Sequence, residues 1–151
     1  MFSDPSHTIE QFELQSGSRV ADLGAGSGEL SLRAARAVGE HGKVYAVEVQ
    51  KELLERLKSR AREERVSNLH ALWGDIERIG GTHLKDHSVD AAIASNVLCQ
   101  VADRPGFLSE TRRILKPGGK VLLIDWAESF GGLPYPAASA RRGMGPQPKD
   151  L

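Results

Sequence analysis

Val20-Ala21-Asp22-Leu23-Gly24-Ala25-Gly26-Ser27-Gly28 is the segment from which the architecture of this chain can be worked out. It reads as an apolar strand that reaches an acidic residue and then turns through three glycines at alternate positions. Glycine has no Cβ, so it tolerates positive φ and lets the backbone approach a ligand closely. The next residues, 29–38, have the pattern of an amphipathic helix, whose first N–H groups would be unpaired and aimed at the turn. The segment predicts a loop that holds a nucleotide-like ligand, although such a turn can also serve packing alone.

The spacing of the glycines distinguishes between two kinds of nucleotide-binding loop. A dinucleotide fingerprint, G-x-G-x-x-G, would need glycine at position 29, which is Glu29. The spacing here is G-x-G-x-G, with Asp22 two residues before the first glycine, and it resembles the first motif of class I S-adenosylmethionine (SAM)-dependent methyltransferases. The resemblance implies that Asp22 supports the loop and the methionine end of the cofactor. It also implies a cofactor-binding loop made of Gly24, Ala25, Gly26, Ser27 and Gly28.

Short apolar strands alternate with helical patterns along the chain, which predicts an α/β fold with a mainly parallel sheet. The predicted strands are residues 19–23, 43–48, 69–73, 89–94 and 120–125. The predicted helices are residues 4–14, 29–38, 51–65 and 104–115, with a turn at Lys116-Pro117-Gly118-Gly119. The resemblance implies a Rossmann-like three-layer sandwich with strand order 3-2-1-4-5.

Two further motifs follow the second and third predicted strands. Glu48 closes the second strand, followed by Val49, and an acid there can accept hydrogen bonds from both ribose hydroxyls. The resemblance implies that Asp75 accepts a hydrogen bond from the adenine amino group and that Ile76 packs on the adenine ring. It also implies that Gly74, just before them, borders the cofactor. Two alternatives stay open: Glu48 as an ordinary surface acid, and Asp75 as the cap of a following helical turn.

The loop after the fourth predicted strand lies at the carboxyl edge of the sheet, where open α/β sheets bind ligands. We expect Ser95, Asn96 and Val97 to border both the cofactor and the substrate. We expect Cys99 to be a small buried apolar residue rather than a nucleophile. His7 could reach the methyl-transfer centre as a base or lie in solvent at the start of a helix. The sequence assigns no catalytic residue.

Composition narrows the possible classes of protein. The chain has 151 residues, of which 40% are hydrophobic, and this suits a single core. Lysine plus arginine and aspartate plus glutamate number 20 each, so no overall charge recruits nucleic acid. A single cysteine excludes an internal disulfide, no histidine pair has the spacing of metal ligands, and no apolar run reaches membrane-spanning length. We expect a cytoplasmic protein.

The predicted domain is residues 1–129, followed by a Gly/Pro-rich tail over residues 130–151. The resembling family, in the broad group that includes ubiquinone and menaquinone biosynthesis methyltransferases, continues with an antiparallel strand pair that we expect to be missing here. Strand five would then be an open edge. A truncated fragment, a tail that folds back and a homodimer are the three interpretations.

The sequence therefore predicts a SAM-dependent methyltransferase that acts on a small molecule. A catalytically silent SAM-binding module and an NAD-binding oxidoreductase domain are the alternatives.

Overall fold

A computed structural model describes the backbone of residues 5–125 and the side chains of residues 7–125. The predicted domain boundary at residue 129 and the tail of residues 130–151 lie outside this part of the chain. The elements are α1 (Pro5–Phe12), β1 (Arg19–Leu23), α2 (Glu29–Val38), β2 (Lys43–Glu48), α3 (Lys51–Glu63), β3 (Leu69–Trp73), β4 (Val89–Ser95), α4 (Arg104–Ile114) and β5 (Leu115–Ile124).

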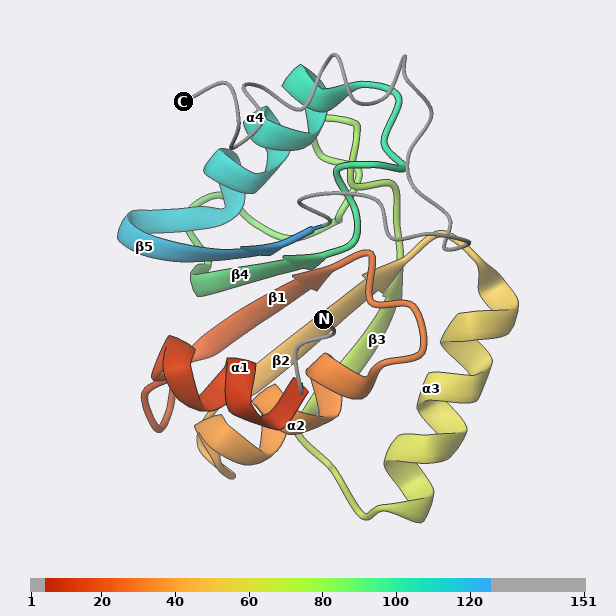
Figure 1. The fold of residues 1–151 in the computed structure, drawn as a ribbon, viewed down its shortest axis with the longest axis vertical. Coiled ribbons are helices and arrows are strands. Elements are labelled where there is room, and N and C mark those ends of the chain that lie inside the picture. The colour runs from red at the N-terminus through yellow and green to blue at the C-terminus, as the bar shows by residue number, and fades with distance from the viewer. Residues whose placement is uncertain (1–4, 126–151) are drawn as a thin grey trace, which may run out of the picture.

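The five strands form one sheet in the order β3-β2-β1-β4-β5, and every neighbouring pair is parallel (Figure 1). Ala21, in the middle of the central strand β1, pairs with Tyr45 of β2 on one side and Ala92 of β4 on the other. The carboxyl ends of all the strands therefore meet at one edge. The predicted fold class and strand order are confirmed.

Helices cover both faces of the sheet, as a three-layer sandwich requires (Figure 1). On one face, α1 and α2 contribute Ile9 and Val38 to a buried cluster with Val20, Val44 and Ile93 of the strands. The alternate strand residues point to the opposite face, because successive side chains of a strand alternate. There Phe107 and Ile114 of α4 pack with residues such as Ala21 and Val47. The buried strands are apolar on both faces, as parallel sheets usually are.

The predicted helix ends were wrong by two residues at two places. The helix predicted to reach Leu14 ends at Phe12, and the one predicted to reach Arg65 ends at Glu63. Just beyond these ends, Glu13 and Arg65 have φ of 54° and 56°. A left-handed backbone conformation cannot continue a right-handed helix, so it terminates both.

The predicted turn at residues 116–119 and the start of the fifth strand at Lys120 were also wrong. Helix α4 ends at Ile114, and β5 runs continuously from Leu115 to Ile124. Leu115 pairs with Val89 and Lys120 with Ala91, so the intervening residues bulge out of the ladder while both of its ends stay hydrogen-bonded. The predicted fourth strand gains one residue, Ser95.

Strand β5 lies at the edge of the sheet within the described residues. Its Val121 and Leu123 are 42% and 47% exposed. Among the described residues, no helix combines the length and the apolar character needed to cross a bilayer.

Candidate functional site

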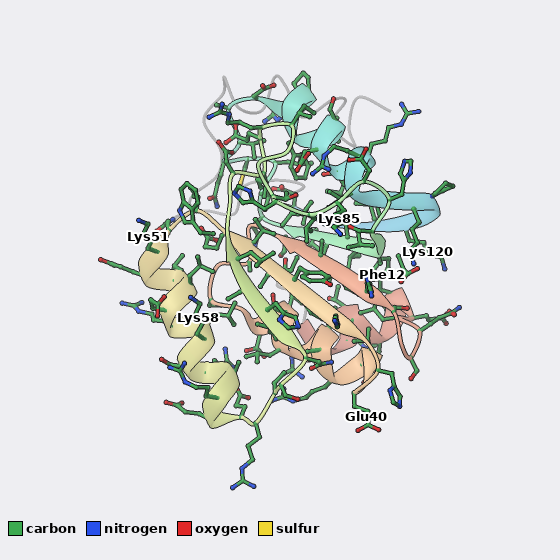
Figure 2. All side chains as sticks on the ribbon, turned by 180° about the vertical axis from the view of Figure 1, so that it is seen from behind. Phe12, Glu40, Lys51, Lys58, Lys85 and Lys120 are labelled. Carbon is green, nitrogen blue, oxygen red and sulfur yellow. The ribbon has the colours of Figure 1, made fainter. Side chains whose placement is uncertain are left out.

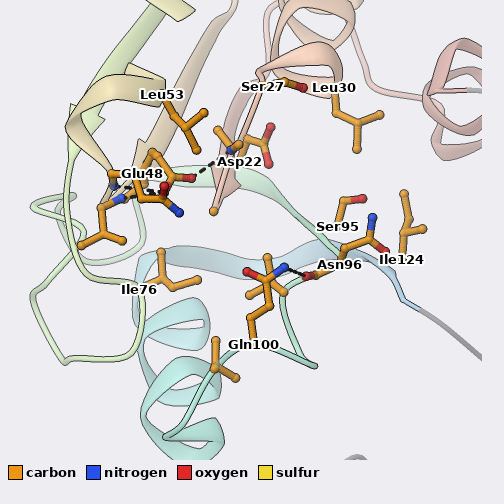
Figure 3. Close-up of a pocket in the computed structure, with 18 of the residues that line it drawn as sticks. Asp22, Ser27, Leu30, Glu48, Leu53, Ile76, Ser95, Asn96, Gln100 and Ile124 are labelled. Carbon is orange, nitrogen blue, oxygen red and sulfur yellow. Dashed lines mark hydrogen bonds between the residues drawn. The ribbon is translucent and has the colours of Figure 1, made fainter. Parts of the chain in front are cut away.

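A cavity of about 700 Å³ lies at the carboxyl edge of the sheet, bordered by the loops that follow β1, β2, β3 and β4 and by the end of β5 (Figure 3). Of the fourteen residues that the sequence assigned to the cofactor, all except Gly28 line it. The topology explains this convergence, because parallel strands bring residues distant in sequence to one edge.

The glycine loop is held against β2 by its backbone. The N–H groups of Gly24 and Ala25 both donate to the carbonyl of Val47, at 2.9 and 3.0 Å. Gly24 has a φ of +75°, and a Cβ there would lie 2.9 Å from a methyl group of Val97. Gly28 has another role: a Cβ on it would collide with Leu57 of α3. The first glycine keeps the cavity floor open, whereas Gly28 lets α2 and α3 pack closely.

Asp22 is a buried carboxylate at the end of β1, 2% exposed. One of its oxygens accepts a hydrogen bond from the Ser31 hydroxyl of α2 at 2.6 Å. Burial raises the pKa of Asp22 to about 6, because the Ser31 bond lowers it only in part and the charge of Glu48 raises it further. Near neutral pH, Asp22 is a costly anion that a nearby cation would stabilise.

Glu48 joins two loops through its carboxylate. One oxygen accepts from the backbone N–H of Gly26 at 2.9 Å, and the other from Val49 and Gln50, both at 3.1 Å. The side chain is 7% exposed and lies close to Asp22 in the cavity wall (Figure 3). It is not the ordinary surface acid of the alternative interpretation.

Asp75 takes part in a tight turn and also lines the cavity. Its Oδ1 accepts from the N–H of Glu77 at 2.9 Å, so it does bind the backbone of the turn that follows, although no helix is formed there. Glu77 in turn accepts from the N–H groups of Ala102 and Asp103, both at 2.7 Å. These bonds connect the loop after β3 to the start of α4.

Asn96, directly after β4, adopts the left-handed backbone conformation, with φ of 57°. Its backbone N–H donates a hydrogen bond to the carbonyl of Ile124 at 2.6 Å. Its carbonyl accepts from Gln100 Nε2 at 3.0 Å, so this loop folds back on itself (Figure 3). Asp125, just beyond β5, accepts from the N–H of Leu98 at 2.9 Å. The ends of β4 and β5 therefore form one connected wall.

Several lining residues were missed from the sequence, among them Gln100, Val101 and Asp125. Gln100 and Val101 belong to the local turn in which their N–H groups donate to the carbonyl of Val97, and Asp125 comes from the end of β5. His7 lies outside the lining and pairs with Gln11 at 3.1 Å, while its neighbour Thr8 lines the cavity. Burial raises the pKa of the Cys99 thiol, which keeps it protonated and weakly nucleophilic. Residues 5–125 contain no grouping of histidine, cysteine or acidic side chains fit to hold a metal ion.

A second buried carboxylate, Glu110 of α4, lies outside the cavity lining and accepts hydrogen bonds from the loop after β3. It accepts from Gly80 N–H at 2.9 Å, from the N–H and hydroxyl of Thr82 at 3.1 and 2.7 Å, and from two nitrogens of Arg113 at 2.7 and 2.8 Å. Burial alone would raise its pKa, but these donors hold the pKa at about 2. We call Glu110, Thr82 and Arg113 the α4 clamp.

Comparison with known proteins gives a consistent result. A family profile described as a methyltransferase domain matches residues 14–137. A 2-phytyl-1,4-naphtoquinone methyltransferase of Trichormus variabilis is 38% identical over 110 residues, which are 73% of this chain and 47% of that protein. The ubiquinone/menaquinone biosynthesis C-methyltransferase UbiE of Vibrio cholerae is 30% identical over 122 residues, 80% of this chain and 46% of that protein. The chain thus spans about half the length of the curated relatives it matches.

The fold comparison agrees. The crystal structure of a SAM-dependent methyltransferase from Aquifex aeolicus superposes with a TM-score of 0.79 at 30% identity. The superposition covers 88% of this chain and 70% of the Aquifex aeolicus chain.

Proposed function

The chain belongs to the class I SAM-dependent methyltransferase family, and from that premise we propose that its cavity binds SAM and transfers the methyl group to a small molecule. The single observation that carries the proposal is the convergence of the glycine loop, Glu48, Asp75 and Asn96 on one cavity. These residues follow the carboxyl ends of β1, β2, β3 and β4, and the parallel sheet brings their polar groups together around one cavity.

The donors and acceptors of the cavity fit this cofactor. Ribose hydroxyls need acceptors, and Glu48 offers a carboxylate at the end of β2. The adenine amino group needs an acceptor beside an apolar surface, which Asp75 and Ile76 provide. The methionine ammonium needs an anion, and Asp22 is a buried carboxylate that lacks a cationic partner among the ion pairs of the described residues.

When bound, SAM supplies a methyl group on a positively charged sulfur, and this group is already reactive toward an acceptor lone pair. The work of the protein is therefore to hold the two partners in line and to exclude water. We assign that positioning to the wall formed by Asn96 and Gln100, after β4, whereas the residues proposed for the ribose and the adenine follow β2 and β3. No side chain is assigned as the base that takes the acceptor's proton.

Calorimetric titration with SAM, S-adenosylhomocysteine and NADH tests the cofactor. Micromolar binding of the first two without binding of NADH is the expected result. Preferential binding of NADH would revive the oxidoreductase alternative, against which Glu29 in place of a third glycine argues. SAM binding without formation of S-adenosylhomocysteine on any small-molecule acceptor would favour the silent module.

We propose that a second copy covers the β5 edge, because Leu108, Val121 and Leu123 are exposed beside a strand that pairs, within residues 5–125, only with β4. Sedimentation velocity of the protein and of Val121→Lys tests this: the variant should lower the dimer fraction. We also propose a cytoplasmic location, in keeping with the free thiol of Cys99.

A further inference from the structure

The loop after β3 carries Asp75 and Ile76 of the cavity lining, and it closes on itself through its backbone. The N–H of Asp75 donates to the carbonyl of Gly81 at 3.0 Å, and the N–H of Gly81 donates to the carbonyl of Arg78 at 2.9 Å. The Asp75 carboxylate accepts from the N–H of Glu77 within the same loop. Because the Asp75 N–H is bonded to Gly81, the position of Asp75 depends on that of Gly81.

The α4 clamp holds Gly81 by its two neighbours in sequence. One carboxylate oxygen of Glu110 accepts from the N–H of Gly80, and the other accepts from the N–H and the hydroxyl of Thr82. Arg113 donates to both oxygens, so the carboxylate is itself fixed in orientation. Two attachments, one on each side of Gly81, determine where its carbonyl points.

The clamp acts on the loop without reaching the cavity. Glu110 and Thr82 are fully buried, and no clamp residue belongs to the cavity lining. The opposite side of the loop is attached to the start of α4, where the Glu77 carboxylate accepts from the N–H groups of Ala102 and Asp103. Helix α4 is therefore the support against which the loop after β3 is placed.

We propose that the α4 clamp positions the adenine-binding group of the cavity: it holds Gly81, and through Gly81 it keeps the Asp75 carboxylate in place to accept from the adenine amino group. The inference rests on the proposed function, in which Asp75 binds that amino group. An acceptor that is already held in place loses little conformational freedom when the ligand binds. The clamp therefore raises affinity most for ligands that carry the amino group. Since the clamp touches no part of the cavity, its members are positioning residues.

The first test follows the Asp75 amide by hydrogen exchange in the free protein, so it needs no ligand. Thr82→Val removes the hydroxyl that donates to Glu110 and leaves the other donors of the clamp, which makes it a milder change than Glu110→Gln. The Asp75 amide of this variant should exchange about tenfold faster than that of wild type, as the loss of a hydrogen bond to a charged group predicts. Thr82→Ser keeps the hydroxyl and should exchange at the wild-type rate.

A core variant far from α4 separates a local effect from a general loss of stability. Val38 is buried at the end of α2, and Glu40, two residues further on, lies at the opposite end of the molecule from α4 (Figure 2). Val38→Ala destabilises the fold by leaving a cavity, but it should leave the exchange rate of the Asp75 amide unchanged. Equal acceleration in Val38→Ala and Thr82→Val, or none in Thr82→Val, would overturn the inference.

The second test compares two ligands by calorimetry: S-adenosylhomocysteine and its analogue in which hydrogen replaces the adenine amino group. Wild type should bind the first at least about tenfold more tightly, because the analogue lacks the hydrogen bond to a carboxylate. Thr82→Val should reduce this preference at least about threefold, whereas Val38→Ala should keep it. A clamp that only stabilises the fold would weaken both ligands alike, so an unchanged preference in Thr82→Val would overturn the inference.

The inference and the proposed function can fail separately. Failure of wild type to bind S-adenosylhomocysteine would reject the proposed function, while hydrogen exchange would still decide whether the clamp holds Asp75. Asp75→Ala should remove the preference for the amino group. A preference that survives Asp75→Ala would overturn the inference and leave cofactor binding intact.

Discussion

Asp22 and Glu110 are both buried carboxylates, one at the end of β1 and one on α4, and their pKa values move in opposite directions. The pKa of Asp22 rises to about 6, because burial outweighs the single bond from Ser31. The pKa of Glu110 falls to about 2, because Arg113, Thr82 and Gly80 surround it with donors. The difference separates two uses of a buried charge. Glu110 is satisfied within the protein, whereas Asp22 remains incompletely stabilised on the wall of a cavity.

The comparison predicts the largest effect at the α4 clamp. Glu110→Gln removes the charge that Arg113 and Thr82 surround, and breaking a buried pair in this way costs about 3–5 kcal/mol. Urea denaturation at pH 7 should show a loss of this size. Glu55→Gln, at an exposed pair on α3, serves as the control and should change stability by less than about 0.5 kcal/mol. A loss below 1 kcal/mol for Glu110→Gln would contradict the role of the clamp.

Acidic pH should remove the contribution of Glu110 to the free energy of unfolding. The pKa of Glu110 is about 2 in the folded protein and 4.5 ordinarily, so its contribution is complete above pH 4.5 and is lost as the pH falls toward 2. Such a shift corresponds to about 3 kcal/mol. The stability difference between wild type and Glu110→Gln should shrink by about this amount over that range. A difference that stays constant with pH would show that the carboxylate charge is not what stabilises the loop.

On the cavity side, Glu48→Ala should affect binding more than folding. The change removes the proposed acceptor for the ribose and the anchor of the Gly26 N–H. SAM affinity should fall at least about tenfold, equivalent to about 1.4 kcal/mol. Calorimetry on both proteins measures this, with circular dichroism as a check on folding. Unchanged affinity would show that Glu48 does not hold the ribose.

Asp22→Asn should change the free energy of unfolding least. The change should also have the opposite sign to that of Glu110→Gln, because Asp22 costs stability at pH 7 whereas Glu110 contributes it. Because the folded-state pKa of about 6 lies above the ordinary 3.8, the stabilising contribution of Asp22 is complete below pH 3.8 and is lost as the pH rises through 6. The ionised group therefore costs stability at pH 7. Asp22→Asn should be at least as stable as wild type in urea at pH 7, but should bind SAM more weakly. A variant both less stable and equal in affinity would remove the contrast with Glu110.

Sequence reasoning performed well where one local pattern determined the structure. Residues 19–23, 29–38, 43–48 and 69–73 were bounded as the structure has them, since apolar runs and glycine turns mark these ends. The largest error lies where tertiary pairing decides: residues 116–119 look like a turn but bulge within β5, because their flanks pair with β4.

The same distinction applies to the cavity. Gly24, Glu48 and Asn96 are placed by motifs that stand next to strand ends, and they were predicted. Gln100 reaches the lining through a local turn that no motif marks, Asp125 reaches it from the end of β5, and the α4 clamp outside the lining is assembled by contacts distant in sequence. No spacing in the sequence shows that Glu110 meets Gly80, thirty residues earlier.

The most direct test of the account is the number of protons released when SAM binds at pH 6, obtained by calorimetry in two buffers of different ionisation enthalpy. If the SAM ammonium binds beside Asp22, it will lower the pKa of this carboxylate from about 6. Wild type should then release about half a proton per SAM bound at pH 6, whereas Asp22→Asn should release almost none. Equal proton release from the two proteins, or none from wild type, would contradict the claim that this buried carboxylate is stabilised by the cofactor.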